Sequence, residues 1–157
     1  MNDDLTYIKF EVPGKPVQWQ RRVVTKRGFS FMPKLVTSYK SMIVTAYLTA
    51  LGCFRRTHVP HPGPVKMEVE SFWPIPKSRP KWWKAIAQEE RVPMISTPDQ
   101  DNMLKIVGDA LNQVAFVDDR LIYDSRVTMF YSQRPRLVVS LCFLTILENP
   151  KKKPTGA

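Results

Sequence analysis

The chain contains little cysteine, little histidine and no long apolar run. Each of these shortages narrows the range of functions that the chain can have. Its two cysteines, Cys53 and Cys142, lie in apolar surroundings without the spacing of metal ligands, which predicts buried free thiols. Its two histidines, His58 and His61, flank prolines, and we assign them no role. The N-terminus lacks a basic-then-apolar signal pattern, and no apolar run approaches the length of a membrane span. These absences predict a soluble, intracellular protein without a membrane partner.

Acidic residues are also scarce relative to basic ones. The 157 residues include 24 Lys and Arg but 14 Asp and Glu, for a formal net charge of +10. A charge of this sign and size predicts a polyanionic partner, nucleic acid before membrane, although a merely basic soluble surface is the simpler alternative. With 43% hydrophobic residues, the chain is long and apolar enough for one domain with a real core.

Strand and helix patterns alternate along the chain without internal repeats. The strands are predicted over residues 5–12, 29–33, 65–73, 121–131 and 136–147. The last of these is apolar at nearly every position, which is typical of a central strand covered on both faces. The pattern predicts a single α+β domain, a mixed β-sheet with helices packed on it, over residues 1–148. Residues 149–157 are predicted to form a disordered basic tail.

Two helices are predicted ahead of the acidic part of the chain. The first covers residues 37–51, with Thr37 or Ser38 as its cap and Gly52 at its end. Its buried face is predicted to contain Tyr39, Met42, Ile43, Ala46, Tyr47 and Ala50. The second is short, covers residues 82–89 and follows an exposed loop rich in proline and lysine.

The stretch TPDQDNMLK places two carboxylates within three positions of this basic chain, in what we call the DxD loop (Asp99 and Asp101). Asp101 is predicted to cap a helix, and extended backbone before it projects both carboxylates to one side. Lys105 follows one turn beyond Asp101, and Asp109 one turn beyond Lys105, so the three share a polar face. The buried stripe is predicted to contain Met103, Leu104, Val107, Ala110 and Leu111.

A second acidic pair, Asp118 and Asp119, follows this helix after a short connection through Asn112 and Gln113. We predict that the pair begins a strand and that the connection returns one of its members to the DxD loop. Like charges held together need compensation, and magnesium typically takes one or two carboxylates plus waters and phosphate oxygens. Three carboxylates on a basic surface therefore suit metal-assisted hydrolysis of a phosphodiester.

Each of these features also has a simpler explanation. The DxD carboxylates can merely cap a helix, the second acidic pair can form a solvated turn, and Lys105 with Asp109 can be an exposed pair of little value. An EF-hand is excluded, because Met103, Lys105 and Val107 occupy positions that need oxygen ligands and the required glycine is missing. The ordered set as a whole is harder to explain by such roles.

The segment PDQDNMLKIVGDALNQVAFVDDRLI resembles the signature of the RusA family of Holliday-junction resolvases, P-D-x-D-N-x-x-K, then D-A-L, a turn and D-D. The matching residues are Pro98, Asp99, Asp101, Asn102, Lys105, Asp109, Ala110, Leu111, Asp118 and Asp119. FEVPGKPVQWQRR is similar to the family's opening strand and G-K-P turn, and WPIPKSRPK to its middle loop. The chain departs from the family at Asn112 and Gln113, where members often have glycine, but asparagine tolerates a left-handed backbone.

The resemblance implies a RusA-like fold and a small homodimeric endodeoxyribonuclease that depends on magnesium, with manganese as a substitute and no small-molecule cofactor. It implies that Asp99, Asp101 and Asp119 are catalytic and hold the metal. It also implies that Lys105 is needed for catalysis, and it leaves Asp118 as a further candidate ligand. The implied substrate is branched DNA, a four-way junction resolved by paired nicks in opposed strands. Because the family is common in phages and prophages, a bacterial or phage-encoded protein of the cytoplasm is expected.

Two basic runs are candidates for contact with DNA. The first contains Arg21, Arg22, Lys26 and Arg27, and the second contains Lys77 and Arg79. Either run can follow phosphates or be solvated surface, and the resemblance favours contact for the first two arginines. Trp82 and Trp83 invite base stacking, although a tryptophan in the core or in a dimer interface is the commoner case.

Two other functions stay open at this point. A non-catalytic basic DNA-binding protein would use its acidic residues only to cap a helix, and metal-dependent cleavage distinguishes it from a nuclease. A structure-specific nuclease could act on other branched DNA, such as flaps or forks, and a comparison of substrates distinguishes it. One chain of this size offers one acidic cluster, so paired cuts predict a symmetric dimer.

Overall fold

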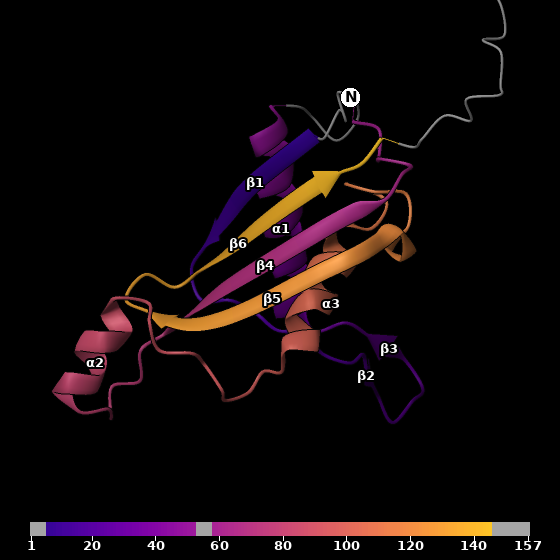
Figure 1. Ribbon diagram of the computed structural model, residues 1–157. Coiled ribbons are helices and arrows are strands. Elements are labelled where there is room, and N and C mark those ends of the chain that lie inside the picture. The colour runs from indigo at the N-terminus through magenta and orange to yellow at the C-terminus, as the bar shows by residue number, and fades with distance from the viewer. Residues whose placement is uncertain (1–5, 53–57, 146–157) are drawn as a thin grey trace, which may run out of the picture.

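Four segments with apolar side chains form the main sheet of the protein, seen in a computed structural model that describes residues 6–52 and 58–145 (Figure 1). Their order across the sheet is β1-β6-β4-β5, where β6 runs antiparallel to both its neighbours and β5 runs parallel to β4. The predicted mixed sheet is therefore confirmed. The strands are β1 (Thr6–Pro13), β4 (Val65–Pro74), β5 (Ile122–Ser132) and β6 (Arg136–Phe143).

The nearly continuous apolar run of β6 matches its place in the sheet. It pairs with β1 on one side and β4 on the other, so it is an inner strand of the sheet. Neighbouring residues Val138 and Val139 face opposite ways, yet both are buried. The prediction of a central strand is confirmed.

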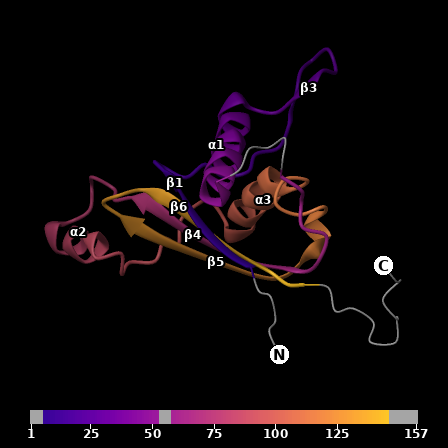
Figure 2. The ribbon, with the colours of Figure 1, turned by 90° about the horizontal axis from the view of Figure 1, so that it is seen from above.

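Helices cover one face of this sheet (Figure 2). Figure 2 shows α1 and α3 side by side on that face, while α2 lies at one end of the sheet. Parallel strands need a crossover, and the connection from β4 to β5 supplies it through α2 and α3. The helices are α1 (Lys34–Leu51), α2 (Lys81–Gln88), α3 (Gln100–Leu111) and the one-turn 3-10 helix η1 (Asp119–Leu121). The described residues thus form the predicted α+β domain.

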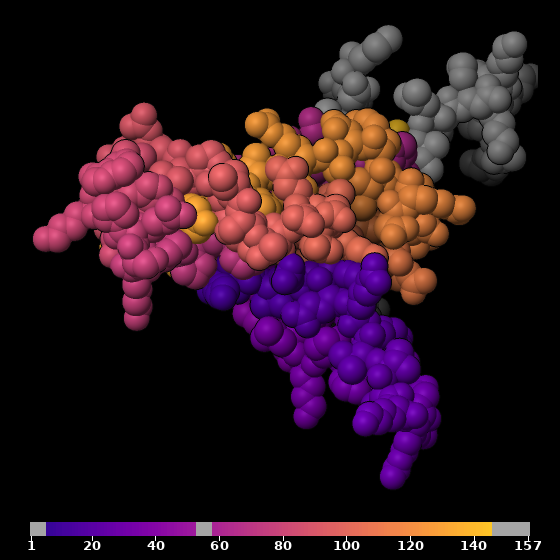
Figure 3. Space-filling view, turned by 90° about the horizontal axis from the view of Figure 1, so that it is seen from below, coloured from indigo at the N-terminus to yellow at the C-terminus, as the bar shows by residue number. Residues whose placement is uncertain are grey.

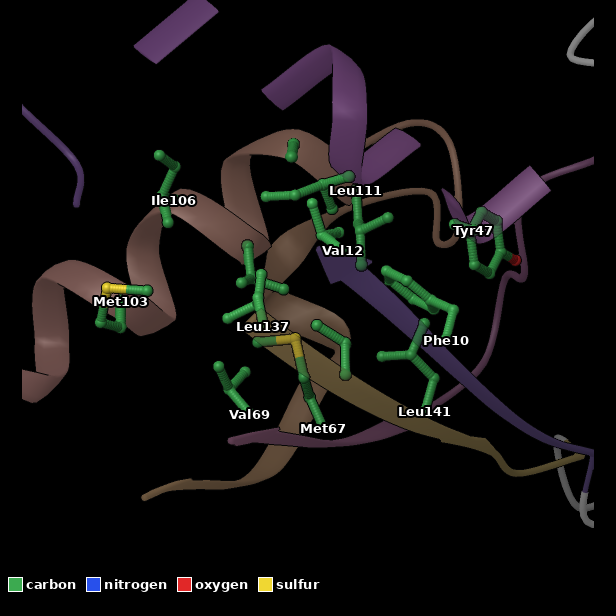
Figure 4. Packing of buried hydrophobic residues seen from close by; sticks show 14 of the residues in the cluster. Phe10, Val12, Tyr47, Met67, Val69, Met103, Ile106, Leu111, Leu137 and Leu141 are labelled. Carbon is green, nitrogen blue, oxygen red and sulfur yellow. The ribbon is translucent and has the colours of Figure 1, made fainter. Parts of the chain in front are cut away.

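The core lies between the sheet and the two covering helices (Figure 4). Alternate residues of β4, Met67 and Val69, belong to the same buried cluster as Met103 and Leu111 of α3. Val65 is buried as well, so the predicted inward face of β4 is confirmed. Packing of this kind holds α3 firmly, which sets the position of every side chain at its ends.

The first helix begins earlier than its pattern predicted. It starts at Lys34 after Pro33, so neither Thr37 nor Ser38 caps it, and that prediction is wrong. The Thr37 hydroxyl instead donates to the Pro33 carbonyl within the first turn. Gly52 ends the helix in a left-handed conformation, as predicted. The buried residues are Val36, Tyr39, Ile43 and Tyr47, whereas Met42 and Ala50 are exposed, contrary to prediction.

A small two-stranded sheet stands apart from the domain. It is a hairpin of β2 (Val23–Val24) and β3 (Ser30–Phe31) that projects away from the main sheet in Figures 2 and 3. A strand near Phe31 was predicted, but its partner was not. Two residues are too few to show the alternation by which a strand is recognised.

Some predictions fall outside the part of the chain that the structure describes. They concern Cys53, the domain boundary at residue 148 and the tail over residues 149–157. Cys142 is a free thiol, half-buried instead of fully buried as predicted. Among the described residues, no helix combines the length and the apolar character that a membrane crossing requires.

Candidate active site

The DxD loop lies at the start of α3. The helix begins at Gln100, so Asp99 occupies the cap position in extended backbone and Asp101 lies in the first turn. The prediction that Asp101 caps the helix is wrong, and Asp99 makes no capping hydrogen bond with its side chain. Both carboxylates are exposed. The Gln100 side-chain amide donates to the Val127 carbonyl at 3.3 Å, which fixes this end of α3 against β5.

The apolar stripe of α3 explains why these polar residues stay outside. Its buried residues include Met103, Ile106, Val107, Ala110 and Leu111. Ile106 was not predicted to be buried, and Leu104, which was, is half-buried. The opposite side of the helix carries Asp101 and Lys105, both exposed, and the half-buried Asp109.

Lys105 has a partner that sequence reasoning missed. Its ammonium nitrogen lies 3.6 Å from the centre of the Trp19 ring, a cation–π contact. The Trp19 backbone N–H donates to the Asn102 carbonyl at 3.2 Å, so residues before the hairpin run along the first turn of α3. Within the described residues, Lys105 forms no ion pair with Asp101 or Asp109. The only signal in the sequence was an aromatic residue among basic ones in GKPVQWQRR.

The second acidic pair does not begin a strand, as was predicted. Asp118 precedes η1 and Asp119 is its first residue, while β5 starts at Ile122. The Asp118 carboxylate accepts a hydrogen bond from the Arg120 N–H at 3.0 Å and lies 3.7 Å from the Arg120 guanidinium. Asp119 is exposed. Asp118 therefore has a local structural task, which leaves Asp119 as the carboxylate that can face a ligand.

Within one chain the two acidic groups lie far apart. The DxD loop is at the first turn of α3 and Asp119 follows its other end, and a helix of 12 residues is about 18 Å long. The strand gives a second estimate of this separation. The first turn of α3 contacts β5 at Val127, and the five residues from Ile122 to Val127 span about 16 Å of strand. The prediction that the connection returns Asp118 or Asp119 to the DxD loop is wrong for a single chain. Consistently, no group of three or more His, Cys, Asp or Glu side chains placed to hold a metal ion occurs in residues 6–52 and 58–145.

The donor chemistry of the DxD loop nevertheless fits a hard cation. Asp99 and Asp101 are neighbouring exposed carboxylates, and neither is engaged in a hydrogen bond or ion pair within the described part of the chain. Magnesium needs one or two carboxylates when waters and phosphate oxygens complete its shell. One chain thus offers two oxygen ligands and a nearby ammonium, with the third carboxylate elsewhere on the surface.

The two basic runs lie on different parts of the molecule (Figure 1). The first, Arg21, Arg22, Lys26 and Arg27, is exposed on and beside the β2–β3 hairpin. This run follows Trp19 directly and therefore begins next to the DxD loop. The second, Lys77 and Arg79, lies in the exposed loop before α2.

The two tryptophans of α2 differ in their surroundings. Trp83 is half-buried, with its ring edge-on to Tyr131 at 5.2 Å and the Arg79 guanidinium 4.9 Å from its ring centre. It thus packs against the sheet, the commoner role that was weighed for it. Trp82 is 66% exposed.

Comparison with known proteins gives the family. The chain is 34% identical over 137 residues to the uncharacterized protein YqaN of Bacillus subtilis (strain 168), a match that covers 85% of this chain and 94% of that protein. The family described as endodeoxyribonuclease RusA matches residues 13–142, from the end of β1 into β6, and so includes both acidic groups and the hairpin. This family acts on Holliday-junction DNA, and RusA-type resolvases are in general metal-dependent nucleases. Since the match spans most of the sequence and the fold agrees with it, the chain belongs to the RusA family of endodeoxyribonucleases.

Proposed function

We propose that this protein is a metal-dependent endodeoxyribonuclease that resolves Holliday junctions by paired nicks in opposed strands. The observation that carries the proposal is the first turn of α3. There, two exposed carboxylates and the Lys105 ammonium lie where the basic hairpin joins the domain. A basic surface attracts the phosphate backbone of DNA. Two neighbouring carboxylates repel each other, and a bound cation relieves that repulsion.

Each residue of the site has a separate task in this proposal. Asp99, Asp101 and Asp119 would hold Mg²⁺, with Mn²⁺ as a substitute. When bound, such a cation activates water and stabilises the leaving oxygen. Lys105 neutralises charge that develops on the phosphate or positions the attacking water. Trp19 keeps the ammonium at the α3 surface, because the face of an indole ring attracts a cation.

The proposed active unit is a homodimer. A four-way junction has two-fold symmetry in its strands, so a two-fold dimer matches the paired cuts. The separation of Asp119 from the DxD loop in one chain supports the same unit. A two-fold axis can set Asp119 of one copy beside the DxD loop of the other, which completes two equivalent sites. Asp118 stays with Arg120 in this arrangement.

Mixing two inactive variants tests this shared site. Asp101→Asn and Asp119→Asn should each be inactive alone. In a mixed dimer with shared sites, both changes fall in one site and the other site is intact, so the mixture should nick a junction. If each site comes from one chain, the mixed dimer carries one change in each site and stays inactive. An inactive mixture, with mixed dimers verified by differently tagged chains, would rule the shared site out.

Cleavage of branched substrates tests the function itself. Labelled four-way junction, fork, flap and duplex are compared on gels with Mg²⁺ and with EDTA. We expect the junction to be cleaved with Mg²⁺ and not with EDTA. We also expect a linear product from a supercoiled plasmid with an extruded cruciform. Binding without cleavage would make the protein a non-catalytic DNA-binding protein. Faster cleavage of flaps or forks would make another branched DNA its substrate.

The cellular setting is part of the proposal. RusA relatives are common in phages and prophages, which indicates a bacterial or phage-encoded protein. Its DNA substrate lies in the cytoplasm, and the basic surface is suited to reach it there. Fractionation of the producing bacterium, with the protein detected by antibody, should place it in the cytoplasm and not in the membrane fraction.

A further inference from the structure

The β2–β3 hairpin is an arm that extends beyond the domain (Figure 3). Its turn is closed by backbone hydrogen bonds from the Gly28 N–H to the Thr25 carbonyl at 2.9 Å and from the Thr25 N–H to the Phe29 carbonyl at 2.8 Å. Gly28 has a φ of 81°, which glycine adopts without strain. A two-stranded hairpin by itself is marginally stable in water, so an arm of this kind gains from a partner that covers it.

One face of the arm is apolar and uncovered. Val23 pairs directly with Phe31, and Phe29 lies two residues before Phe31, so the three side chains share a face. Their exposed fractions are 45% for Val23, 49% for Phe31 and 71% for Phe29. Exposed apolar side chains that gather on one face indicate a binding surface.

The other face of the arm carries Arg22, Ser30 and Val24, of which Val24 is 67% exposed. There the Arg22 guanidinium donates to the Ser30 hydroxyl at 2.9 Å and to the Ser30 carbonyl at 3.2 Å. Arg22 also lines an open groove of about 670 Å³ together with Lys40 of α1 and Asp109 of α3. At the base of the arm the face with Arg22 is therefore turned to the domain, and the face with Phe29 and Phe31 is the opposite one.

Charge identifies the partner of this face. The sequence has no acidic residue between Glu11 and Glu68, a span that contains the whole arm. Exposed cations stand at both ends of the apolar face, Arg21 at its base and Lys26 with Arg27 at its tip. A second copy laid on this face would set like charges against each other. A nucleic acid instead offers phosphates for the cations and flat apolar bases for the aromatic rings.

We propose that the arm recognises the branch point of a DNA junction, where Phe29 and Phe31 stack on a base pair left open by the branching strands. In a continuous duplex each base pair is covered by its neighbours, so an apolar side chain reaches a base face only after a base step has been unstacked, which costs free energy. At a branch point stacking is interrupted and such a face is available. The aromatic side chains of the arm thus distinguish junctions from duplex, while its cations bind the phosphates of both. This inference deepens the proposed function and depends on it.

Phe29→Ala tests the inference. A four-way junction carries 2-aminopurine at its branch point, and binding is measured in EDTA so that no cleavage occurs. Wild-type protein should change the fluorescence, because the aromatic rings then cover the open face of the base. Phe29→Ala should lose this change and bind the junction about tenfold more weakly, while its affinity for duplex and the salt dependence of binding stay the same. Phe29→Tyr should restore both, since its ring stacks as well.

A matched control removes an exposed aromatic side chain elsewhere. Tyr7 of β1 is 61% exposed, and Tyr7→Ala should behave like the wild type on junction and duplex. Circular dichroism should show that Phe29→Ala is folded, as expected for a mostly exposed side chain.

Three results would overturn the inference. They are a fluorescence change in Phe29→Ala equal to that of the wild type, an equal loss of affinity for duplex and junction, and a shift from dimer to monomer in sedimentation. The last would assign the face to a second copy of the chain. Wild-type protein is tested in parallel for junction cleavage with Mg²⁺. Failure of that cleavage would overturn the proposed function. If the wild type cleaves the junction and Phe29→Ala matches it in fluorescence and junction affinity, only the role of the arm is overturned.

Discussion

Two regions of this basic chain carry carboxylates, which in one region lack partners within the described part of the chain and in the other are paired. In the DxD loop, the carboxylates of Asp99 and Asp101 are exposed and accept no hydrogen bond from the described residues. Next to α2, Glu90 is held on both oxygens by the Arg136 guanidinium, at 2.6 and 3.1 Å, and accepts a bond from the Ser132 hydroxyl at 2.7 Å. The first carboxylates are available to a ligand, and the second is already satisfied by the fold.

The difference indicates what each carboxylate is for. The hydrogen bond with Arg136 lowers the pKa of the Glu90 carboxyl although partial burial opposes it, and the same pair raises the pKa of Arg136. Removal of one partner of such a pair destabilises the fold, because the other is left unpaired. Neighbouring unpaired carboxylates repel each other and contribute no such stability. Substitutions in the two regions should therefore separate activity from stability.

The largest effect is expected for the carboxylates of the proposed site. Asp99→Asn, Asp101→Asn and Asp119→Asn should each lower junction cleavage roughly a thousandfold or more, because a bound cation contributes several kcal/mol to the transition state. Binding should be kept or strengthened, since negative charge near phosphates is removed. Thermal unfolding should be unchanged or occur at higher temperature. Single-turnover cleavage, junction titration and a melting curve measure the three quantities.

Asp118→Asn is the control for this series. Its carboxylate caps η1, so a small loss of stability is expected, about 1 kcal/mol or less, with milder loss of cleavage. Near-normal cleavage in any of the three other variants would remove that residue from the site. Equal loss in Asp118→Asn would show that the wrong member of the pair was chosen.

The next effect concerns the ammonium beside the carboxylates. Lys105→Ala should lower turnover about a hundredfold, as expected when one group that stabilises developing charge is lost. Junction affinity should change little, because many other cations contact the backbone. Rates at saturating enzyme and separate binding curves distinguish the two. Weaker binding with unchanged turnover would make Lys105 an ordinary phosphate contact.

A smaller effect is expected at Trp19, which touches the ammonium and not the proposed substrate. Trp19→Leu should lower turnover about tenfold through loss of the cation–π contact, while Trp19→Phe should retain most of it. In a Lys105→Ala background the same change at Trp19 should have no further effect on turnover. An equal loss in both backgrounds would mean that Trp19 acts through packing alone.

The smallest effect on cleavage, and the clearest effect on stability, is expected at Glu90. Glu90→Gln should leave turnover unchanged and lower the free energy of unfolding by about 1–2 kcal/mol at neutral pH, a value reduced for partial exposure. Because its pKa is lowered in the folded protein, the ionised Glu90 contributes stability above its ordinary pKa. That stability is lost as pH falls through the lowered value. Urea titrations at several pH values check this, and a parallel acid dependence in Glu90→Gln would contradict it.

Much of the architecture could be predicted from local pattern. Alternation predicted β1 and the inward face of β4, continuous apolar character predicted a central β6, and residues 82–89 were close to α2. The signature in the segment from Pro98 to Ile122 identified the RusA family, which the family match over residues 13–142 confirms. These features depend on the identity and spacing of residues near each other in the chain.

The sequence by itself thus determined the strands of the main sheet, the basic surface and the family. Tertiary structure decided which of these residues meet. It placed Trp19 over Lys105 and held Asp119 away from the DxD loop. It also engaged Glu90 with Arg136 and left the apolar face of the β2–β3 hairpin uncovered. Periodicity reports which way a side chain points within its own element. Contacts between distant residues depend on how whole elements pack, and a core packed as densely as a crystal allows few arrangements.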